Sequence, residues 1–191
     1  GREPVEVSVV IRSADSSLWA NTRLGMEQAA GDLGAELRFL TPGADNDREE
    51  QKELLRREVE RGTDALVLAP VDPADLGAEW AALAGDTPTV TLESELPGAV
   101  ALITPDNEAL GRALARRALE EYRGGTVLLL DCLPENTGVR ARVEAAEAAL
   151  IRGGATVLRW SETEEEELTR LDEEGSLTVA FQGQPGLYNL V

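Results

Sequence analysis

The sequence predicts an α/β protein built on parallel sheets. Short β-branched apolar runs that end in Gly, Pro or Asp alternate with longer Ala-, Leu-, Glu- and Arg-rich runs of helical spacing. The connections between these runs are short, which favours parallel strands joined by right-handed crossovers. The length of 191 residues, with 42% hydrophobic and 28% charged side chains, suits a packed chain with one large core or two small ones.

The predicted strands are the short apolar runs that lie between turn residues. They cover residues 5–11, 36–40, 65–69, 89–92, 100–103, 126–131, 156–160 and 177–181. The run 65–69 is almost wholly apolar, so we expect that strand to be covered on both faces.

The predicted helices follow these strands and end at glycines. They cover residues 18–33, 47–61, 74–83, 108–122, 139–152 and 164–171. Gly34, Gly62 and Gly153 stand where helices should stop, and Ser16 or Ser17 is the expected N-cap of the first helix. The last predicted helix is acidic, and its carboxylates lack the Gly-containing alternation of a calcium loop, so we interpret it as a solvated face.

Charge and composition exclude several classes of function. The 36 acidic and 18 basic residues give a formal charge of −18, which argues against binding to nucleic acid or to anionic membranes. The absence of histidine removes His-based triads, metal sites and proton shuttles, and the single Cys132 cannot form an intrachain disulfide. No phosphate-binding glycine loop occurs, so nucleotide chemistry has no support. Neither a cofactor nor a metal is expected. No apolar run reaches the roughly 20 residues of a membrane span, and we expect any leader before Gly1 to have been removed.

Six ordered segments give the chain its resemblance to a known family. They are VSVVIRSADSSLW, LGMEQAAGDLGAEL, RGTDALVLAPVDP, TPTVTLES, ITPDNEALGRALA and TGVRARVEAAEAAL. In this order they resemble the type I periplasmic binding proteins, in particular the sugar-binding branch with ribose- and galactose-type receptors. The segment RGTDALVLAPVDP is the most specific, because it joins a helix stop, an apolar strand and a Pro-Asp-Pro loop.

The resemblance implies two Rossmann-like lobes with parallel sheets that close over a small polar solute. The expected lobes are residues 1–103 and 104–191. The family's chain usually continues further, so we expect the second lobe to be incomplete and its exposed sheet edge to allow self-association. Ligands of such sheets bind outside the carboxyl ends of the strands.

Four candidate ligand-binding residues fall in the expected first lobe. Asp15, Ser16 and Trp19 follow the first strand, and an indole can cover the apolar face of a sugar ring. Glu93 follows strand 89–92, where sugar-binding relatives often carry an Asp-Arg pair, and Ser94 stands in place of the arginine. The alternatives are that Trp19 packs as ordinary core and that Glu93 is a solvated loop acid.

Three further candidates belong to the expected second lobe. Arg142 matches the family's ligand-binding arginine, whose fixed donors suit hydroxyls, although it and Arg140 could instead pair with acids of the same helix. Asp106 is either a cleft residue or a helix cap, and capping is favoured. Gln184 is either a polyol-binding amide or part of a surface turn.

The resemblance thus implies an extracytoplasmic binding protein without catalysis. Its expected ligand is a sugar or polyol, and its expected partner is an ABC transporter permease or a membrane sensor. The alternatives are the effector-binding core of a LacI-type regulator, or a sensor domain of a signalling receptor. A Rossmann-like enzyme fits less well because the motifs that it needs are missing.

Overall fold

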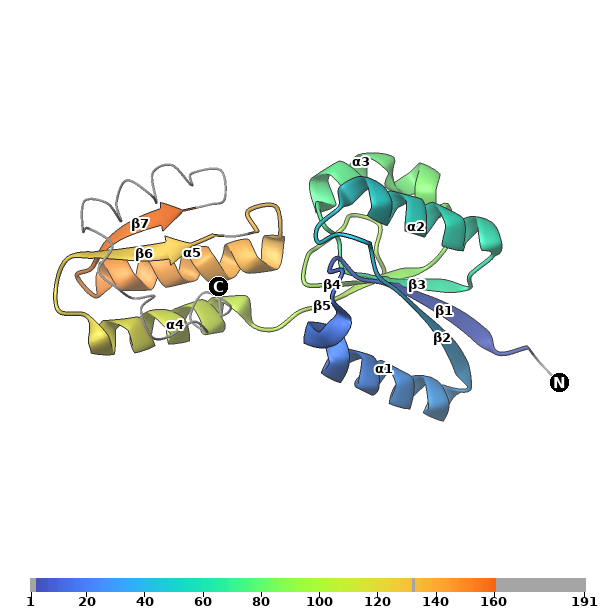
Figure 1. The fold of residues 1–191 in the computed structure, drawn as a ribbon, viewed down its shortest axis with the longest axis horizontal. Helices are drawn as coiled ribbons and strands as arrows, with labels where there is room; N and C mark the ends of the chain where they lie inside the picture. Colours follow the sequence, from blue (N-terminus) through green and yellow to red (C-terminus); the bar gives the residue numbers. More distant parts are fainter. Residues whose placement is uncertain (1–2, 132, 161–191) are drawn as a thin grey trace. The chain divides into compact units, whose positions relative to one another are not determined.

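The computed structural model describes residues 3–131 and 133–160. The chain divides into two compact units, residues 1–104 and residues 105–191 (Figure 1). Every strand pair in the described part is parallel, and helices connect the strands, so the predicted α/β class with parallel sheets is confirmed. The helix and strand expected at 164–171 and 177–181 lie outside the described residues.

The first unit contains a five-stranded parallel sheet. Its strands are β1 (Val5–Val10), β2 (Ala35–Leu40), β3 (Ala65–Leu68), β4 (Thr89–Leu92) and β5 (Ala101–Ile103). They lie in the order β2-β1-β3-β4-β5, and this order reverses direction between β1 and β3. In a doubly wound sheet such a switch point opens a crevice at the carboxyl ends of the strands.

Helices lie on both faces of this sheet. They are α1 (Ala20–Leu33), α2 (Arg48–Arg61) and α3 (Pro73–Ala84), with α2 and α3 on one face and α1 on the other (Figure 1). The core lies under α2 and α3, where Val10, Leu68 and Trp80 pack in one apolar cluster. Along β3, Leu66 and Leu68 are buried whereas Ala65 and Val67 are only half-buried. Both faces of β3 are therefore covered, the face with Leu66 and Leu68 fully and the face with Ala65 and Val67 in part.

Short polar caps set the helix boundaries. A 3₁₀ helix, η1 (Ser16–Trp19), precedes α1, and its cap is Asp15, whose side chain accepts a hydrogen bond from the Ser17 N–H. The prediction of Ser16 or Ser17 as the cap was wrong, because the chain turns one residue earlier. Gly34 and Gly62 end α1 and α2 in the left-handed region, with φ of 67° and 90°, and confirm the predicted stops.

A buried charge network lies at the amino-terminal end of this sheet. The Glu58 carboxylate has a side chain only 3% exposed and receives hydrogen bonds from Arg38 and Arg61. Arg61 also pairs with Glu6 of β1. Burial raises the pKa of Glu58, but the hydrogen bonds from Arg38 and Arg61 outweigh it and leave this pKa below its ordinary value. The network joins α2 to β1 and β2.

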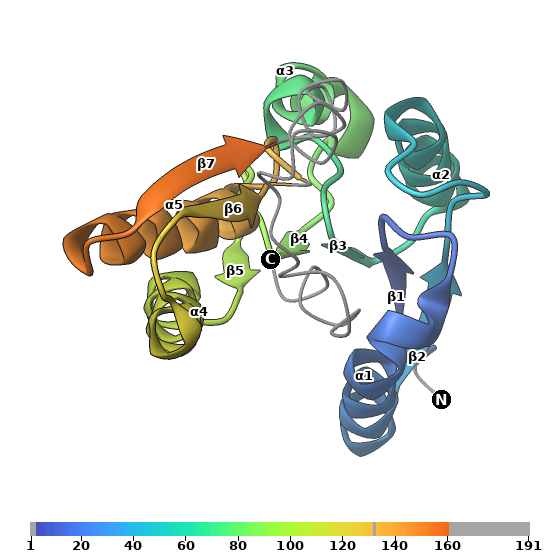
Figure 2. The ribbon, with the colours of Figure 1, turned by 60° about the vertical axis from the view of Figure 1, so that its left-hand side comes forward.

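Within residues 105–131 and 133–160, the second unit has a two-stranded parallel sheet and two helices. Its elements are α4 (Asn107–Glu121), β6 (Thr126–Leu130), α5 (Thr137–Arg152) and β7 (Thr156–Trp160). Both helices lie on the same side of the sheet (Figure 2). They approach closely at Gly111 of α4, where an added Cβ would stand 2.2 Å from the Arg142 carbonyl oxygen. Gly111 is therefore the residue that permits this helix crossing.

Gly111→Ala should destabilise the second unit by at least about 2 kcal/mol, because the new methyl group meets backbone rather than a movable side chain. The matched control is Gly25→Ala on α1, where nothing lies within 4 Å of the new Cβ. That change should stabilise the chain by roughly 0.5–1 kcal/mol through helix propensity. Urea unfolding of both variants measures the difference. Equal effects at the two glycines would contradict the close helix contact.

Low pH should lower the free energy of unfolding partly through protonation of Glu58. The pKa of Glu58 is lowered in the folded state, so the unfolded chain takes up the proton first, near its ordinary value of about 4.3. The stabilisation is present above that pH and is lost as pH falls through the lower folded-state pKa. Glu58→Gln should therefore reduce the fall in unfolding free energy between about pH 5 and pH 3. Glu60→Gln, at an exposed position of the same helix, should leave this fall in unfolding free energy unchanged.

Candidate functional site

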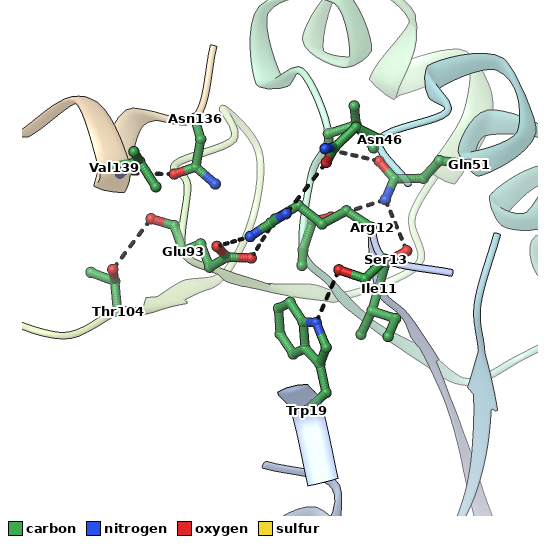
Figure 3. Close-up of polar contacts among 12 residues, drawn as sticks. Ile11, Arg12, Ser13, Trp19, Asn46, Gln51, Glu93, Thr104, Asn136 and Val139 are labelled. Atoms are coloured by element: carbon green, nitrogen blue, oxygen red, sulfur yellow. Dashed lines mark hydrogen bonds and ion pairs between the residues drawn. The ribbon is translucent and has the colours of Figure 1, made fainter. Parts of the chain in front are cut away.

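The carboxyl ends of the parallel strands meet at one edge of the first unit's sheet. The loops that leave this edge hold Arg12, Ser13, Asn46 and Glu93, and Trp19 lies at the end of η1 (Figure 3). Because every strand runs the same way, residues distant in sequence come together there. This edge is the candidate functional site, and we call it the strand-end site.

Gln51 occupies the switch point between β1 and β3. Its side chain is 2% exposed, and its amide nitrogen donates to the Ile11 and Ala69 carbonyl oxygens at 3.3 and 2.9 Å. Its amide oxygen accepts from the Val71 N–H at 2.9 Å. One buried amide from α2 thus fixes the ends of two strands and satisfies backbone groups that the turns leave open.

Arg12 and Glu93 form a two-point ion pair across the strand-end site. Nε of Arg12 donates to Oε1 of Glu93 and Nη2 donates to Oε2, both at 3.0 Å (Figure 3). The two side chains are 17% and 24% exposed. Such a fork holds both partners in one plane and is stronger than a single-point surface pair. We call this pair the Arg12–Glu93 fork.

The backbone around Glu93 places its side chain in the fork. Glu93 has a φ of 66°, in the left-handed region that non-glycine residues seldom occupy. Its N–H donates to the Ile103 carbonyl oxygen, and its own carbonyl oxygen accepts from the Thr104 hydroxyl at 3.2 Å. These contacts hold a conformation that is unfavourable on its own, which is a common feature of functional loops.

Trp19 lies beside the fork. Its indole N–H donates to the Ser13 hydroxyl at 3.3 Å, and its ring centroid is 6.0 Å from the Arg12 guanidinium carbon. Ser13 is 8% exposed, so the indole is anchored on a buried residue. Trp19 itself is half-buried, and it belongs to none of the three apolar clusters that the described residues form. The alternative that Trp19 is ordinary core does not describe this environment.

The loop after β2 is hydrogen-bonded to the loop after β1. Nη1 of Arg12 donates to the Asn46 side-chain oxygen at 3.3 Å, and the Asn46 N–H donates to the Arg12 carbonyl oxygen at 2.8 Å. The Ala14 N–H donates to Asp45 Oδ1 at 2.7 Å. The loop after β2 therefore holds the loop after β1 from both sides.

The other two first-unit candidates lie near the fork in sequence. Asp15 is exposed and caps η1, and the hydrogen bond from the Ser17 backbone N–H lowers the pKa of its carboxyl. Ser16 is half-buried at the start of η1. Asp15 thus has a structural contact, whereas Glu93 and Trp19 are the two candidates that the fold brings together around Arg12.

In the second unit, the candidate side chains contact the ends of helices. Asp106 caps α4 by accepting from the Ala109 N–H at 3.0 Å, so the favoured capping interpretation is confirmed. Arg142 donates through Nε and Nη2 to the Asn107 side-chain oxygen at 3.2 and 2.9 Å. Asn136 caps α5 through Val139 (Figure 3), and Arg140 donates to the Pro134 carbonyl oxygen. Gln184 and Cys132 lie outside the described residues.

Sequence reasoning missed Arg12, Ser13 and Gln51. Arg12 and Ser13 directly follow the first predicted strand, at a loop where a ligand site is expected, but the candidates from that loop were Asp15, Ser16 and Trp19. Gln51, Leu54, Leu55 and Glu58 are the buried residues of α2 and recur at helical spacing. A glutamine at the helical spacing of these buried positions was the available signal.

A separate pocket of about 340 Å³ lies along β5 and the loop before it. Its lining is mostly apolar, and none of Arg12, Trp19 and Glu93 contributes to it. Thr91 lines it and is fully buried, and its hydroxyl has no hydrogen-bond partner within the part of the chain that the structure describes. The pocket offers few polar groups, so the strand-end site remains the stronger candidate for a polar solute.

Over residues 3–131 and 133–160, no group of three or more Cys or acidic side chains is arranged to hold a metal ion. No helix in those same ranges is long and apolar enough to cross a membrane.

The fold and the strand-end site define a doubly wound lobe with a polar site at its strand ends. The chain belongs to the periplasmic binding protein domain family, whose model matches residues 7–180. The recognition made from the sequence is confirmed by this match. No curated protein sequence matches the chain.

Several solved structures of similar fold are carbohydrate- or polyol-binding proteins. One is a carbohydrate transporter solute binding protein from Agrobacterium radiobacter in complex with D-arabinose, with a TM-score of 0.77 and 18% identity over 92% of this chain and 65% of that chain. A glucose-galactose binding protein from Geobacillus stearothermophilus has a TM-score of 0.77 and 19% identity over 92% of this chain and 66% of that chain.

A third similar structure is the Caulobacter myo-inositol binding protein bound to myo-inositol. Its TM-score is 0.70, with 21% identity over 91% of this chain and 65% of that chain. The chain thus spans about two-thirds of the length of these proteins.

Gln51→Leu should destabilise the first unit by about 2–4 kcal/mol, because it removes the partners of two buried carbonyl oxygens and one N–H. Gln28→Leu, at an exposed position of α1, is the control and should change stability by less than about 0.5 kcal/mol. Chemical unfolding measures both. A Gln51→Leu variant as stable as the control would show that Gln51 does not hold the strand ends.

Proposed function

We propose that this chain is a non-catalytic solute-binding protein that binds a sugar or polyol at the strand-end site. The observation that carries the proposal is the Arg12–Glu93 fork beside Trp19, at the carboxyl ends of a parallel sheet. Membership of the periplasmic binding protein domain family supports it.

The chemistry of the strand-end site suits a ring that bears hydroxyl groups. The fork contains donors on the guanidinium and acceptors on the carboxylate, and a hydroxyl group needs both. Trp19 supplies an indole, which can cover the apolar C–H face of a sugar ring. The similar structures from Agrobacterium radiobacter and Caulobacter are complexes with D-arabinose and myo-inositol, which agrees with a ligand of this chemistry.

The residues of the second unit remain part of the proposal. Arg142 is the guanidinium that the family resemblance implies at a ligand, and Asn107 holds two of its nitrogens. Asp106 has its capping contact with Ala109, so we assign Arg142, rather than Asp106, to the ligand.

Membership of the same family supports a proposal for the location and the partners of the chain. We infer an extracytoplasmic location, with delivery of the solute to an ABC transporter permease or its detection by a membrane sensor. The similar structures from Agrobacterium radiobacter and Caulobacter are a transporter's solute binding protein and an inositol binding protein, respectively, and they support this setting.

A thermal-shift screen tests the function. D-Arabinose, D-glucose, D-galactose and myo-inositol should include a solute whose stabilisation rises with concentration, to about 2.7 kcal/mol at one hundred times its dissociation constant. Trp19→Ala should weaken that solute's binding at least tenfold, through the loss of the stacking surface. Trp19→Phe keeps an aromatic ring and should retain most of the affinity. A saturable shift that is identical in wild type and Trp19→Ala would contradict the site assignment.

A further inference from the structure

The direction of the Trp19 indole depends on a hydrogen bond more than on packing. No residue of η1 is buried, and Leu18, directly before Trp19, is 87% exposed. Trp19 lies outside the three apolar clusters, and its ring centroid is 6.0 Å from the Arg12 guanidinium carbon, at the outer limit of a cation–π contact. Within the described residues, the contact that directs the indole is the bond from its N–H to the Ser13 hydroxyl.

Ser13 is a fixed point for that bond. It is 8% exposed, and both of its neighbours in sequence are hydrogen-bonded to the loop after β2. On one side, the Asn46 N–H donates to the Arg12 carbonyl oxygen at 2.8 Å. On the other side, the Ala14 N–H donates to Asp45 Oδ1 at 2.7 Å. The position of the Ser13 oxygen is therefore set by the backbone of two loops, and the indole turns toward it.

We propose that Ser13 is a positioning residue that fixes the plane of the Trp19 indole, so that the strand-end site prefers closed rings to open-chain polyols. This inference rests on the proposed function and adds to it a residue that determines specificity. Ser13 acts through Trp19 and needs no contact of its own with the solute.

The preference follows from the shapes of the two kinds of solute. A closed ring presents a rigid apolar C–H face, which gains most from an aromatic plane that is already in place before binding. An open-chain polyol has no rigid face, because its carbon chain changes conformation freely and loses that freedom when it lies flat on a surface. Its binding therefore depends on hydrogen bonds and gains little from a fixed indole.

Ser13→Ala removes the acceptor, so the indole N–H of half-buried Trp19 can turn to water. Affinity for a ring should fall about fivefold, the effect of one lost hydrogen bond, whereas affinity for an open chain should stay within about twofold. The uncharged pairs are D-glucose with D-sorbitol, D-galactose with galactitol, and myo-inositol with D-sorbitol, and isothermal calorimetry gives their affinities. Ser13→Thr keeps the hydroxyl and should retain the wild-type ratio of ring to open-chain affinity.

Ser8→Ala is the matched control. Ser8 is also a buried serine with a hydrogen-bonded hydroxyl, but its partner is Thr63, at 2.8 Å, which precedes β3 at the amino-terminal end of the sheet. This variant should keep the wild-type ratio of ring to open-chain affinity. A second readout is hydrogen exchange of the Trp19 indole N–H, followed by NMR. Exchange should be faster in Ser13→Ala than in wild type, Ser13→Thr and Ser8→Ala, because the bond that protects this N–H is lost.

The outcomes separate this inference from the proposed function. If wild type binds a ring and Ser13→Ala binds it as tightly, or weakens ring and open chain alike, the inference is overturned and the binding function stands. The inference is also overturned if Ser8→Ala reproduces the effect of Ser13→Ala, if indole exchange is unchanged in Ser13→Ala, or if wild type binds open chains as tightly as rings. If no probe binds wild type, the proposed function fails together with the inference. Circular dichroism verifies that each variant is folded.

Discussion

The strand-end site depends on the all-parallel pairing of the first unit's sheet. Parallel pairing in the order β2-β1-β3-β4-β5 brings every carboxyl end to one edge, and without it residues 12 and 93 would not meet. Gln51 then fixes the ends of β1 and β3 at the switch point, and the loop after β2 holds the loop after β1. At the opposite end, Glu58 and its two arginines join α2 to the sheet. The amino-terminal end thus carries a network that stabilises the sheet, and the carboxyl-terminal end carries the site that we propose for a solute.

The chemistry of the site follows from local charge balance in an acidic chain. The protein carries 36 acidic and 18 basic residues, yet the strand ends place an arginine and a glutamate in direct contact. A hydroxyl group needs a donor and an acceptor within reach of each other, and the fork supplies both without net charge. Trp19 lies within the range of a cation–π contact with Arg12, so the aromatic surface and the polar fork are held as one group.

The sequence predicted the fold well because strands and helices leave regular patterns. Strands 89–92 and 156–160 match β4 and β7 residue for residue, and Gly34 and Gly62 end their helices as expected. The cap of η1 was missed by one or two residues, since Asp, Ser and Ser in succession are all acceptable N-caps. Of the candidate site residues, Trp19 and Glu93 were chosen for their residue type and their position after a strand, and in the structure both contact Arg12. Arg12 was not, because its importance comes from a contact 81 residues away in sequence, which no local pattern records.

The most direct test of the central claim is the indole region of a ¹H–¹⁵N NMR spectrum during titration with a neutral monosaccharide that stabilises the chain. The Trp19 Nε1–H lies at the strand-end site, bonded to Ser13, whereas Trp80 is packed in the core beneath α3. We expect the Trp19 signal to move in a saturable manner, together with the backbone amides of Arg12 and Glu93, while the Trp80 signal stays in place. A sugar that stabilises the protein and leaves the Trp19, Arg12 and Glu93 signals unchanged would contradict the account.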